Sequence, residues 1–292
     1  MEQFLYLILR GITRTFNFLP LSLLYFVSDF FYLNSYYILK YRRRVVRENL
    51  QNSFPELPLS EIIKIEKKFY RHISDISVET LYFSDISKKE VEKRVTIENP
   101  ELPMKYLKEG RQVITSLGHY NNWEWISSLK LFLDTTYYPV YKPLHSKAFD
   151  KFYYRFRSRF GATPIDKNQI FKRLYKDAKE GIPSISGFIN DQSPKRDNIQ
   201  YWTTFLNQET AMFLGVEKIS KKLDAVVLAA EIEKPKRGYY NVRFTLITEN
   251  AKDEPPYAIT EKDAQHLESI IRKNPEYWLW SHKRWKHKKE EQ

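Results

Sequence analysis

The sequence contains no cysteine among its 292 residues. Disulfide bonds, thiolate zinc sites, iron–sulfur clusters and cysteine nucleophiles are therefore all excluded. The 8 glycines and 14 prolines are also too few for a collagen-like or low-complexity chain. Because 42% of the residues are hydrophobic, the chain can bury a sizeable core, and wholesale disorder is excluded as well.

Positive charge and aromatic side chains are, by contrast, abundant. The formal net charge is +12, and 16% of the residues are Phe, Trp or Tyr. A basic and aromatic-rich protein suits an anionic partner, either nucleic acid or an anionic membrane surface. Composition alone does not choose between these two partners.

The N-terminal region favours the membrane. Residues 3–39 are dense in apolar and aromatic side chains and carry only three charges. The stretch over 15–39 is long enough to span a hydrocarbon core of ~30 Å. Pro20, Asp29 and the many aromatic rings are more typical of helices that lie at the interface. No small-residue cleavage site follows the apolar run, so a signal peptide is not expected.

A basic cluster follows this apolar run and contains five cations, Lys40, Arg42, Arg43, Arg44 and Arg47. Such a cluster is typical of the cytoplasmic side, where it faces anionic lipid headgroups. We therefore expect residues 1–90 to form a membrane-associated helical region that either spans the bilayer or lies on it. The alternative is a buried helical hairpin followed by a solvated basic turn.

The rest of the chain alternates short apolar runs with amphipathic stretches. Strands are predicted at 112–117, 136–141, 162–165, 184–189, 225–232 and 239–247. Helices are predicted at 60–82, 121–133, 147–160, 167–180, 209–222 and 260–273. This alternation predicts an α/β domain over residues 91–292, with a mostly parallel central sheet flanked by helices. Ligands of such sheets bind beyond the carboxyl ends of the strands.

One pair of residues at such a strand end is suited to catalysis. His119 follows the strand predicted at 112–117, and Glu124 lies in the first turn of the next helix. A carboxylate on one imidazole nitrogen makes the other nitrogen a better base, so the pair could take a proton from a substrate hydroxyl. The same spacing also fits a histidine that is merely hydrogen-bonded to a helix-capping glutamate.

Three further residues are expected near this pair. Asp191 follows the strand predicted at 184–189, so it would lie on the same edge of the sheet as His119. Arg155 and Arg157 lie in the connection between the strands and could supply positive charge there.

Five segments, in a shared order, resemble the late acyltransferases of lipid A biosynthesis, the lauroyl/myristoyl-transferase family of the Gram-negative envelope. The resemblance covers nearly the whole chain. The segments are 41–56, His119 with Glu124, 155–158, 190–192 and 277–286. The chain departs from the family at Phe205-Leu206-Asn207, where a Phe-Gly step is common, and at Lys283-Arg284, where a double arginine is common.

The resemblance implies transfer of a fatty acyl chain from acyl carrier protein to a hydroxyl of a lipid A precursor, as a step of lipopolysaccharide biosynthesis. It implies the cytoplasmic face of the inner membrane and no metal or organic cofactor. His119 would be the general base, and Glu124 would orient it. Some relatives acylate other envelope lipids or pigments, which leaves another acceptor as the alternative.

The resemblance also implies roles for basic and acidic residues. Arg157, or nearby backbone N–H groups, would stabilise the oxyanion of the tetrahedral intermediate. Asp191 would take part in the same site, or would instead anchor the Arg-rich helix by ion pairs. Lys142, Arg155, Arg157 and Lys195 would contact the phosphates or acidic sugars of the precursor. Each of these four could equally be part of a solvated basic face.

Other classes of protein fit less well. A glycerol-phosphate acyltransferase also uses a His-x4-acid pair, but Gly118 stands where that class has an asparagine. A serine hydrolase is disfavoured because the G-x-S-x-G elbow is missing. A nucleic-acid-binding protein would explain the charge and the aromatics but not the apolar N-terminus, so no nucleic-acid partner is expected. A non-catalytic membrane scaffold would retain its properties after His119→Ala.

Overall fold

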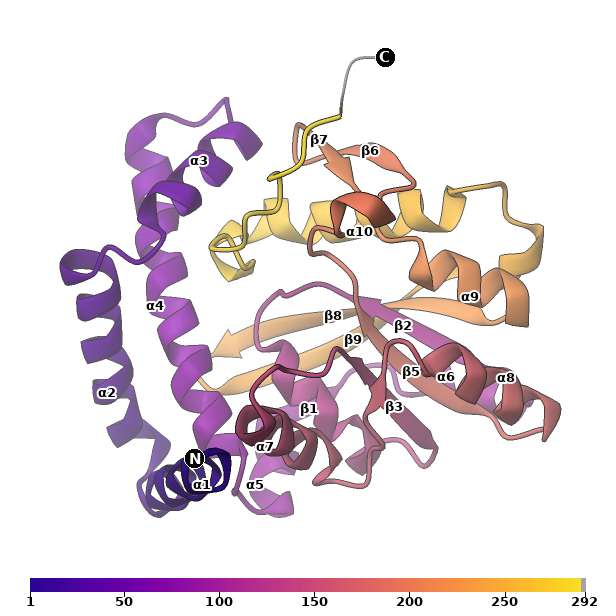
Figure 1. Ribbon diagram of the computed structural model, residues 1–292, viewed down its shortest axis with the longest axis horizontal. Coiled ribbons are helices and arrows are strands. Elements are labelled where there is room, and N and C mark those ends of the chain that lie inside the picture. Colours follow the sequence, from indigo (N-terminus) through magenta and orange to yellow (C-terminus); the bar gives the residue numbers. More distant parts are fainter. Residues whose placement is uncertain (290–292) are drawn as a thin grey trace.

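The computed structural model describes residues 1–289 and contains a central seven-stranded sheet (Figure 1). The strand order is β1-β9-β8-β2-β5-β3-β4. All neighbouring strands are parallel except β8 and β9, which form an antiparallel hairpin. The strands are β1 (Val95–Ile97), β2 (Val113–Leu117), β3 (Thr136–Tyr141), β4 (Ile165–Asp166), β5 (Ser184–Ile189), β8 (Val226–Lys236) and β9 (Tyr239–Thr248). The mostly parallel α/β sheet expected from the sequence is therefore confirmed.

The middle of the sheet is formed by β2 and β5. Every residue of β2 is buried, as are the first five residues of β5, because helices cover both faces of a parallel sheet. Gly187 of β5 allows Tyr137 of the neighbouring strand β3 to pack closely, since a Cβ at position 187 would lie 2.8 Å from the hydroxyl of Tyr137. These two apolar strands form a rigid base for the residues that follow them.

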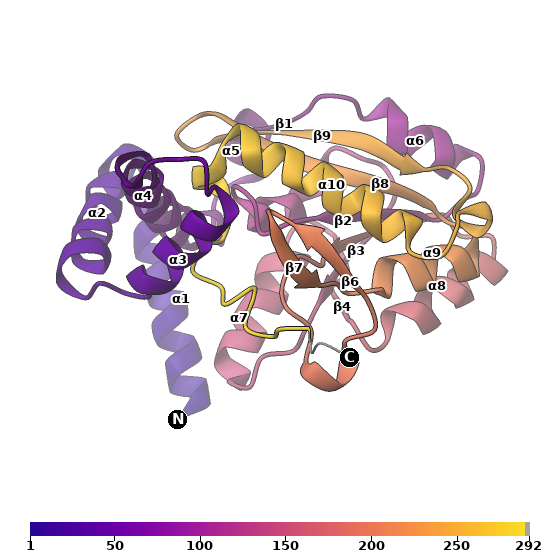
Figure 2. The same cartoon turned by 90° about the horizontal axis from the view of Figure 1, so that it is seen from above.

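Ten α-helices surround the sheet within residues 1–289. The helices of the α/β part are α6 (Glu101–Lys108), α7 (Lys147–Ser158), α8 (Ile170–Lys179), α9 (Gly215–Leu223) and α10 (Ala258–Lys273). The N-terminal helices are α1 (Glu2–Phe18), α2 (Leu21–Leu33), α3 (Arg43–Ser53), α4 (Leu59–Phe83) and α5 (Lys88–Arg94). Figure 2 shows α10 lying along β8 and β9, while α1 to α4 gather at one side of the sheet.

The N-terminal helices share the core with the sheet. Leu21 and Leu24 of α2 are buried in the same apolar cluster as β2 and β8. None of the helices in residues 1–289 is both long and apolar enough to cross a membrane. The membrane association of this region and a division of the chain at residue 90 stay predictions.

The C-terminal segment after α10 is also part of the core. It passes between α3 and the hairpin of β6 (Trp202–Phe205) and β7 (Gln208–Ala211) (Figures 1 and 2). It includes a short 3-10 turn, η5 (Pro275–Tyr277). Trp278 and Trp280 are buried in a cluster with Tyr36 and Phe69 of the N-terminal region. This segment therefore joins the N-terminal helices to the α/β part.

The helix predicted at 209–222 is wrong in its first half. Residues Gln208–Ala211 form strand β7, which pairs with β6 (Trp202–Phe205) in a separate antiparallel hairpin. The hairpin turn is Leu206-Asn207, and both residues have left-handed backbone angles (φ 51° and 61°), as a tight primed turn requires. The helix predicted at 121–133 is instead a 3-10 helix, η2 (Trp123–Leu131).

Candidate active site

The side chains of His119 and Asp191 meet at the carboxyl ends of β2 and β5. Leu117 and Ile189 are register partners at the ends of these adjacent parallel strands, and each of the two polar residues lies two positions beyond the end of its strand. Nδ1 of His119 lies 2.6 Å from Oδ1 of Asp191. The backbone N–H of His119 donates to Oδ2 of the same carboxylate at 2.7 Å. Strand register therefore places the imidazole on this carboxylate.

Asp191 is only 4% exposed, yet it remains a strong acceptor. Burial alone would raise its pKa, but His119 and the indole N–H of Trp278, which donates at 2.7 Å, outweigh burial and leave the pKa below its usual value. An ionised carboxylate only accepts hydrogen bonds, so Nδ1 of His119 carries the proton and Nε2 is left as the basic nitrogen.

A glycine beside this pair keeps the contact close. A Cβ on Gly118 would lie 3.1 Å from Oδ2 of Asp191 and 2.7 Å from a methyl carbon of Leu267. Any larger residue would have to push against the carboxylate that holds His119. Close packing around the site therefore favours glycine at position 118.

Glu124 has a different partner from the one that the sequence predicts. Its Oε1 lies 2.8 Å from Nη2 of Arg157, and its Oε2 lies 3.2 Å from Nε of the same guanidinium. Among residues 1–289, no hydrogen bond joins Glu124 to His119, whose orienting carboxylate is Asp191. The expected direct contact is missing because η2 directs Glu124 toward Arg157 of α7, a tertiary contact that sequence spacing does not show. A catalytic role for Glu124 stays a prediction.

Arg157 is held rigidly at the wall of the site. Its guanidinium carbon lies 5.1 Å from the ring centre of Tyr153 and 6.0 Å from that of Tyr141. Burial by itself lowers the pKa of Arg157, but the Glu124 carboxylate more than offsets this and raises it. The guanidinium therefore stays charged in a fixed position.

A pocket of about 200 Å³ joins these groups. Its polar wall includes His119, Glu124, Lys142, Arg157 and Gln192, and much of the remainder is aliphatic or aromatic. Nε2 of His119 lies 3.2 Å from the amide nitrogen of Gln192. The pocket thus presents a basic imidazole nitrogen and a guanidinium to whatever enters it.

The other basic residues named from the sequence are more dispersed. Lys142 lines the pocket, whereas Arg155 points from α7 to Asp85 at 3.5 Å. Asp85 is also the partner of Arg10 of α1, at 2.8 Å. Lys195 is exposed in the loop after Asp191. The alternative in which Asp191 anchors the Arg-rich helix does not hold, because its partners are His119 and Trp278.

The sequence analysis assigned no role to three residues that the structure places in or around the site. Gln192 contacts His119, Trp278 donates to Asp191, and His282 accepts a hydrogen bond from the backbone N–H of Ser193 at 3.2 Å. Burial lowers the pKa of His282 to about 4, so this ring is neutral at pH 7. All three belong to the segments 190–192 and 277–286, whose order along the chain was the only available signal.

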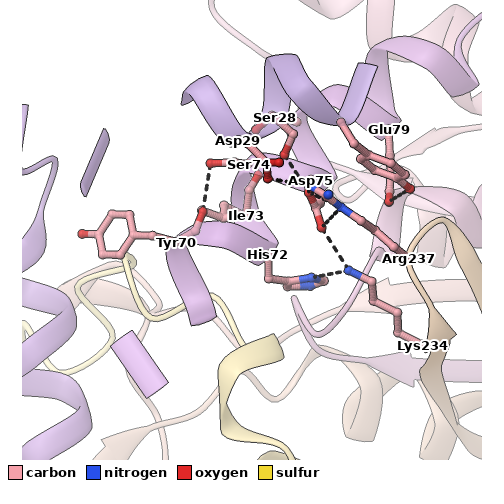
Figure 3. Close-up of polar contacts among 12 residues, drawn as sticks. Ser28, Asp29, Tyr70, His72, Ile73, Ser74, Asp75, Glu79, Lys234 and Arg237 are labelled. Carbon is pink, nitrogen blue, oxygen red and sulfur yellow. Dashed lines mark hydrogen bonds and ion pairs between the residues drawn. The ribbon is translucent and has the colours of Figure 1, made fainter. Parts of the chain in front are cut away.

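A second buried polar cluster is centred on α4 (Figure 3). Asp75 accepts hydrogen bonds from Ser28 at 2.6 Å, Lys234 at 3.3 Å and Arg237 at 3.0 Å. Glu79, one turn further along α4, accepts from Asn122 at 2.7 Å. Asn122 follows His119 by three residues, so this hydrogen bond ties the turn that carries His119 to α4.

Glu79 is enclosed by other donors as well. It accepts hydrogen bonds from the hydroxyls of Tyr25, at 2.7 Å, and Tyr240. Burial raises its pKa. The described residues contain no group of His, Asp and Glu side chains that could hold a metal ion.

Comparison with known protein families gives a match over nearly the whole chain. The family model for bacterial lipid A biosynthesis acyltransferases matches residues 2–287. The matched region includes α1, the sheet, the His119–Asp191 pair and nearly all of the described C-terminal segment. No curated protein matches the chain.

Proposed function

Because the chain belongs to the family of bacterial lipid A biosynthesis acyltransferases, we propose that it moves a fatty acyl chain from acyl carrier protein to a hydroxyl of a lipid A precursor, with His119 as general base. Its activity as an acyltransferase of lipid A biosynthesis follows from the family. The acyl donor and the roles of the residues are the proposal. The observation that carries it is the 2.6 Å contact between Nδ1 of His119 and the buried carboxylate of Asp191.

The first step is attack of the acceptor hydroxyl on the thioester carbonyl carbon. The hydroxyl proton moves to Nε2 of His119 as the new C–O bond forms, and Asp191 stabilises the resulting imidazolium. The tetrahedral intermediate then collapses and the C–S bond breaks. The imidazolium returns the proton to the leaving thiolate, so the products are the acyl ester and the thiol of the carrier protein.

Arg157 stabilises the negative charge of this intermediate. A fixed guanidinium in a pocket with little water interacts with a developing oxyanion more strongly than a mobile one does. Glu124 binds two nitrogens of Arg157 and keeps the guanidinium on the pocket wall. Glu124 is in this mechanism a positioning residue for Arg157, while Asp191 is the positioning residue for His119. No metal or organic cofactor takes part, since the thioester is already activated.

We also propose that the N-terminal region docks on the cytoplasmic face of the inner membrane. Besides Met1, fourteen large apolar or aromatic side chains of the first 41 residues are exposed, among them Phe18, Phe26 and Phe30. Exposed apolar surface of this extent in a monomer marks an interaction site, and the cations at 40–47 suit anionic headgroups. The test is co-sedimentation with anionic vesicles, which Phe26→Glu with Phe30→Glu should weaken. Unchanged sedimentation would contradict this docking.

The catalytic proposal is tested by acyl transfer from labelled acyl carrier protein to a lipid A precursor in detergent. His119→Ala should lower the rate by about 10²-fold or more, whereas the exposed control Lys172→Ala should leave it within about twofold. Transfer that survives in His119→Ala would remove the histidine from the mechanism. A wild-type protein that is inactive with this acceptor but active with another envelope lipid would change the substrate and keep the mechanism.

A further inference from the structure

A second concave surface lies outside the catalytic pocket, between α3 and the C-terminal segment. This groove has a volume of about 1150 Å³. Five cationic side chains line it, against two carboxylates, and the cations come both from α3 (Arg44) and from the C-terminal segment (Lys283, Lys286, Lys288 and Lys289). We call it the basic groove.

Most of the cationic side chains of the basic groove have no ion-pair partner in the described part of the chain. Among residues 1–289, Lys283, Lys286 and Lys288 have no ion-pair partner, and all three are exposed. Arg44 pairs with Glu48 at 2.6 Å, but its side chain is 90% exposed, so that pair is weak. The groove therefore has a positive potential that an anion can use.

The basic groove is tied to the loop that begins at Asp191. His282 accepts from the backbone N–H of Ser193 at 3.2 Å, and His287 contacts the carbonyl of Pro194 at 3.1 Å. Lys283 and Lys286 lie between these two anchors. The same loop includes Gln192, which contacts Nε2 of His119. These hydrogen bonds join the C-terminal wall of the groove to the loop of the active site.

The backbone of the groove wall is rigid. The buried Arg284 donates to the carbonyl of Ala211 at 2.7 Å, and the indole N–H of Trp285 donates to the hydroxyl of Thr210 at 2.7 Å. These two inward side chains leave the neighbouring lysines facing outward. The backbone positions of the lysines are therefore set by the fold before any ligand binds.

We propose that the basic groove binds the phosphorylated saccharide headgroup of the acceptor lipid. This inference rests on the proposed function, because the acceptor is what gives the ligand its phosphate. Lysine ammonium groups bind phosphate oxygens as point charges. The amides of Gln51 and Asn52, which also line the groove and make no side-chain hydrogen bond within the described chain, suit sugar hydroxyls.

An acidic protein fits this groove less well. The carboxylates of Glu48 and Glu209 also line the groove and would repel an acidic protein, whereas they can accept hydrogen bonds from sugar hydroxyls. The observations therefore favour the saccharide over the acyl carrier protein.

The test uses two full-length double variants. The groove variant carries Lys283→Glu and Lys286→Glu, and the control variant carries Lys108→Glu and Lys172→Glu. Both control lysines are exposed and far along the chain from the groove, and the change in net charge is the same. We expect the groove variant to raise KM for the phosphorylated acceptor by about tenfold with kcat within about twofold, and the control to change neither. With a dephosphorylated acceptor, KM should change by less than about twofold.

Equilibrium binding gives a readout without catalysis. A deacylated, phosphorylated glucosamine disaccharide should bind the wild type and the control but at least about fivefold more weakly to the groove variant. Inorganic phosphate at equal concentration should compete only weakly, because it lacks the sugar hydroxyls. Equal competition by inorganic phosphate would reduce the groove to a simple anion site and overturn the headgroup assignment.

Other outcomes would also overturn the inference. A rise in KM for acyl carrier protein instead of the acceptor would make the groove a carrier docking surface. Loss of vesicle binding with unchanged acceptor KM would make it a membrane contact, and no change in any of these would leave it without this role. Each result is distinct from failure of the proposed function, which would abolish transfer in the wild type or leave it intact in His119→Ala.

Discussion

Nδ1 of His119 lies 2.6 Å from Oδ1 of Asp191, although 72 residues separate the two along the chain. The contact exists because β2 and β5 are adjacent parallel strands whose ends are in register at Leu117 and Ile189. Trp278 of the C-terminal segment donates to the same carboxylate from a third direction. The base of the proposed reaction is thus positioned by three distant parts of the sequence.

Replacement of Asp191 by asparagine should lower kcat by about 10²- to 10⁴-fold, with little change in KM. The amide keeps the size of the side chain but cannot stabilise an imidazolium, and it can present its NH₂ group to Nδ1 and so favour the wrong tautomer. Steady-state kinetics with Asp253→Asn, an exposed control, would check this. Equal activity of the two variants would show that Asp191 is structural.

Replacement of Arg157 by lysine should lower kcat by about 10²- to 10³-fold. Lysine keeps the positive charge but cannot bind both oxygens of Glu124, so the charge is no longer fixed on the pocket wall. Glu124→Gln should lower kcat by a smaller factor, and the double variant should lose less than the product of the two single effects. Arg272→Lys on α10 is the matched control, and additive losses would argue against coupling.

Replacement of Asp75 by alanine should lower the free energy of unfolding by about 3 kcal/mol. The change leaves Lys234 and Arg237 without the buried carboxylate that both contact, as Figure 3 shows. Asp29→Ala removes another partner of Arg237, but Asp29 is 47% exposed, so its loss should cost less than about 1 kcal/mol. Urea unfolding monitored by circular dichroism measures the free energy of unfolding of both variants. Equal losses in the two variants would contradict the claim that the buried carboxylate contributes more than the exposed one.

Stability should fall as the pH falls from about 6.5 toward 4. Burial lowers the pKa of His282 to about 4, whereas an unfolded histidine has a pKa of about 6.5. Between these values the unfolded state binds a proton that the folded state does not, so acidification favours unfolding. His72 acts in the same direction, because burial holds its pKa well below the usual value.

The pH dependence is measured as the melting temperature across this range. His282→Gln should flatten the slope relative to the wild type, because the amide does not titrate. His145→Gln, at an exposed position, is the control and should keep the wild-type slope. An unchanged slope in His282→Gln would mean that His282 does not contribute.

Local sequence was sufficient where burial alone specifies the structure. The strand predicted at 184–189 coincides with Ser184–Ile189, and the one at 112–117 differs from Val113–Leu117 by a single residue. Both strands are buried on both faces, so each is a continuous apolar run that has only one stable environment. The long amphipathic helix α4 was recognised for a similar reason, since its apolar face repeats with helical spacing.

Local sequence misled where a long-range partner decides the structure. Residues 208–211 have fair helix propensity, but they pair with Trp202–Phe205 across a left-handed turn at Leu206-Asn207. The pairing supplies hydrogen bonds that an isolated segment does not have. The helix α9 consequently begins only at Gly215.

The sequence itself determined the composition and the order of the family segments. It also placed His119 and Asp191 after the ends of two strands. The choice of carboxylate for His119 was decided only by the tertiary structure. Glu124 is the nearer of the two along the chain, but η2 turns it toward Arg157, while the parallel register of β2 and β5 brings Asp191 to the imidazole. Strand order and register are set by packing of the whole sheet, and no local spacing contains that information.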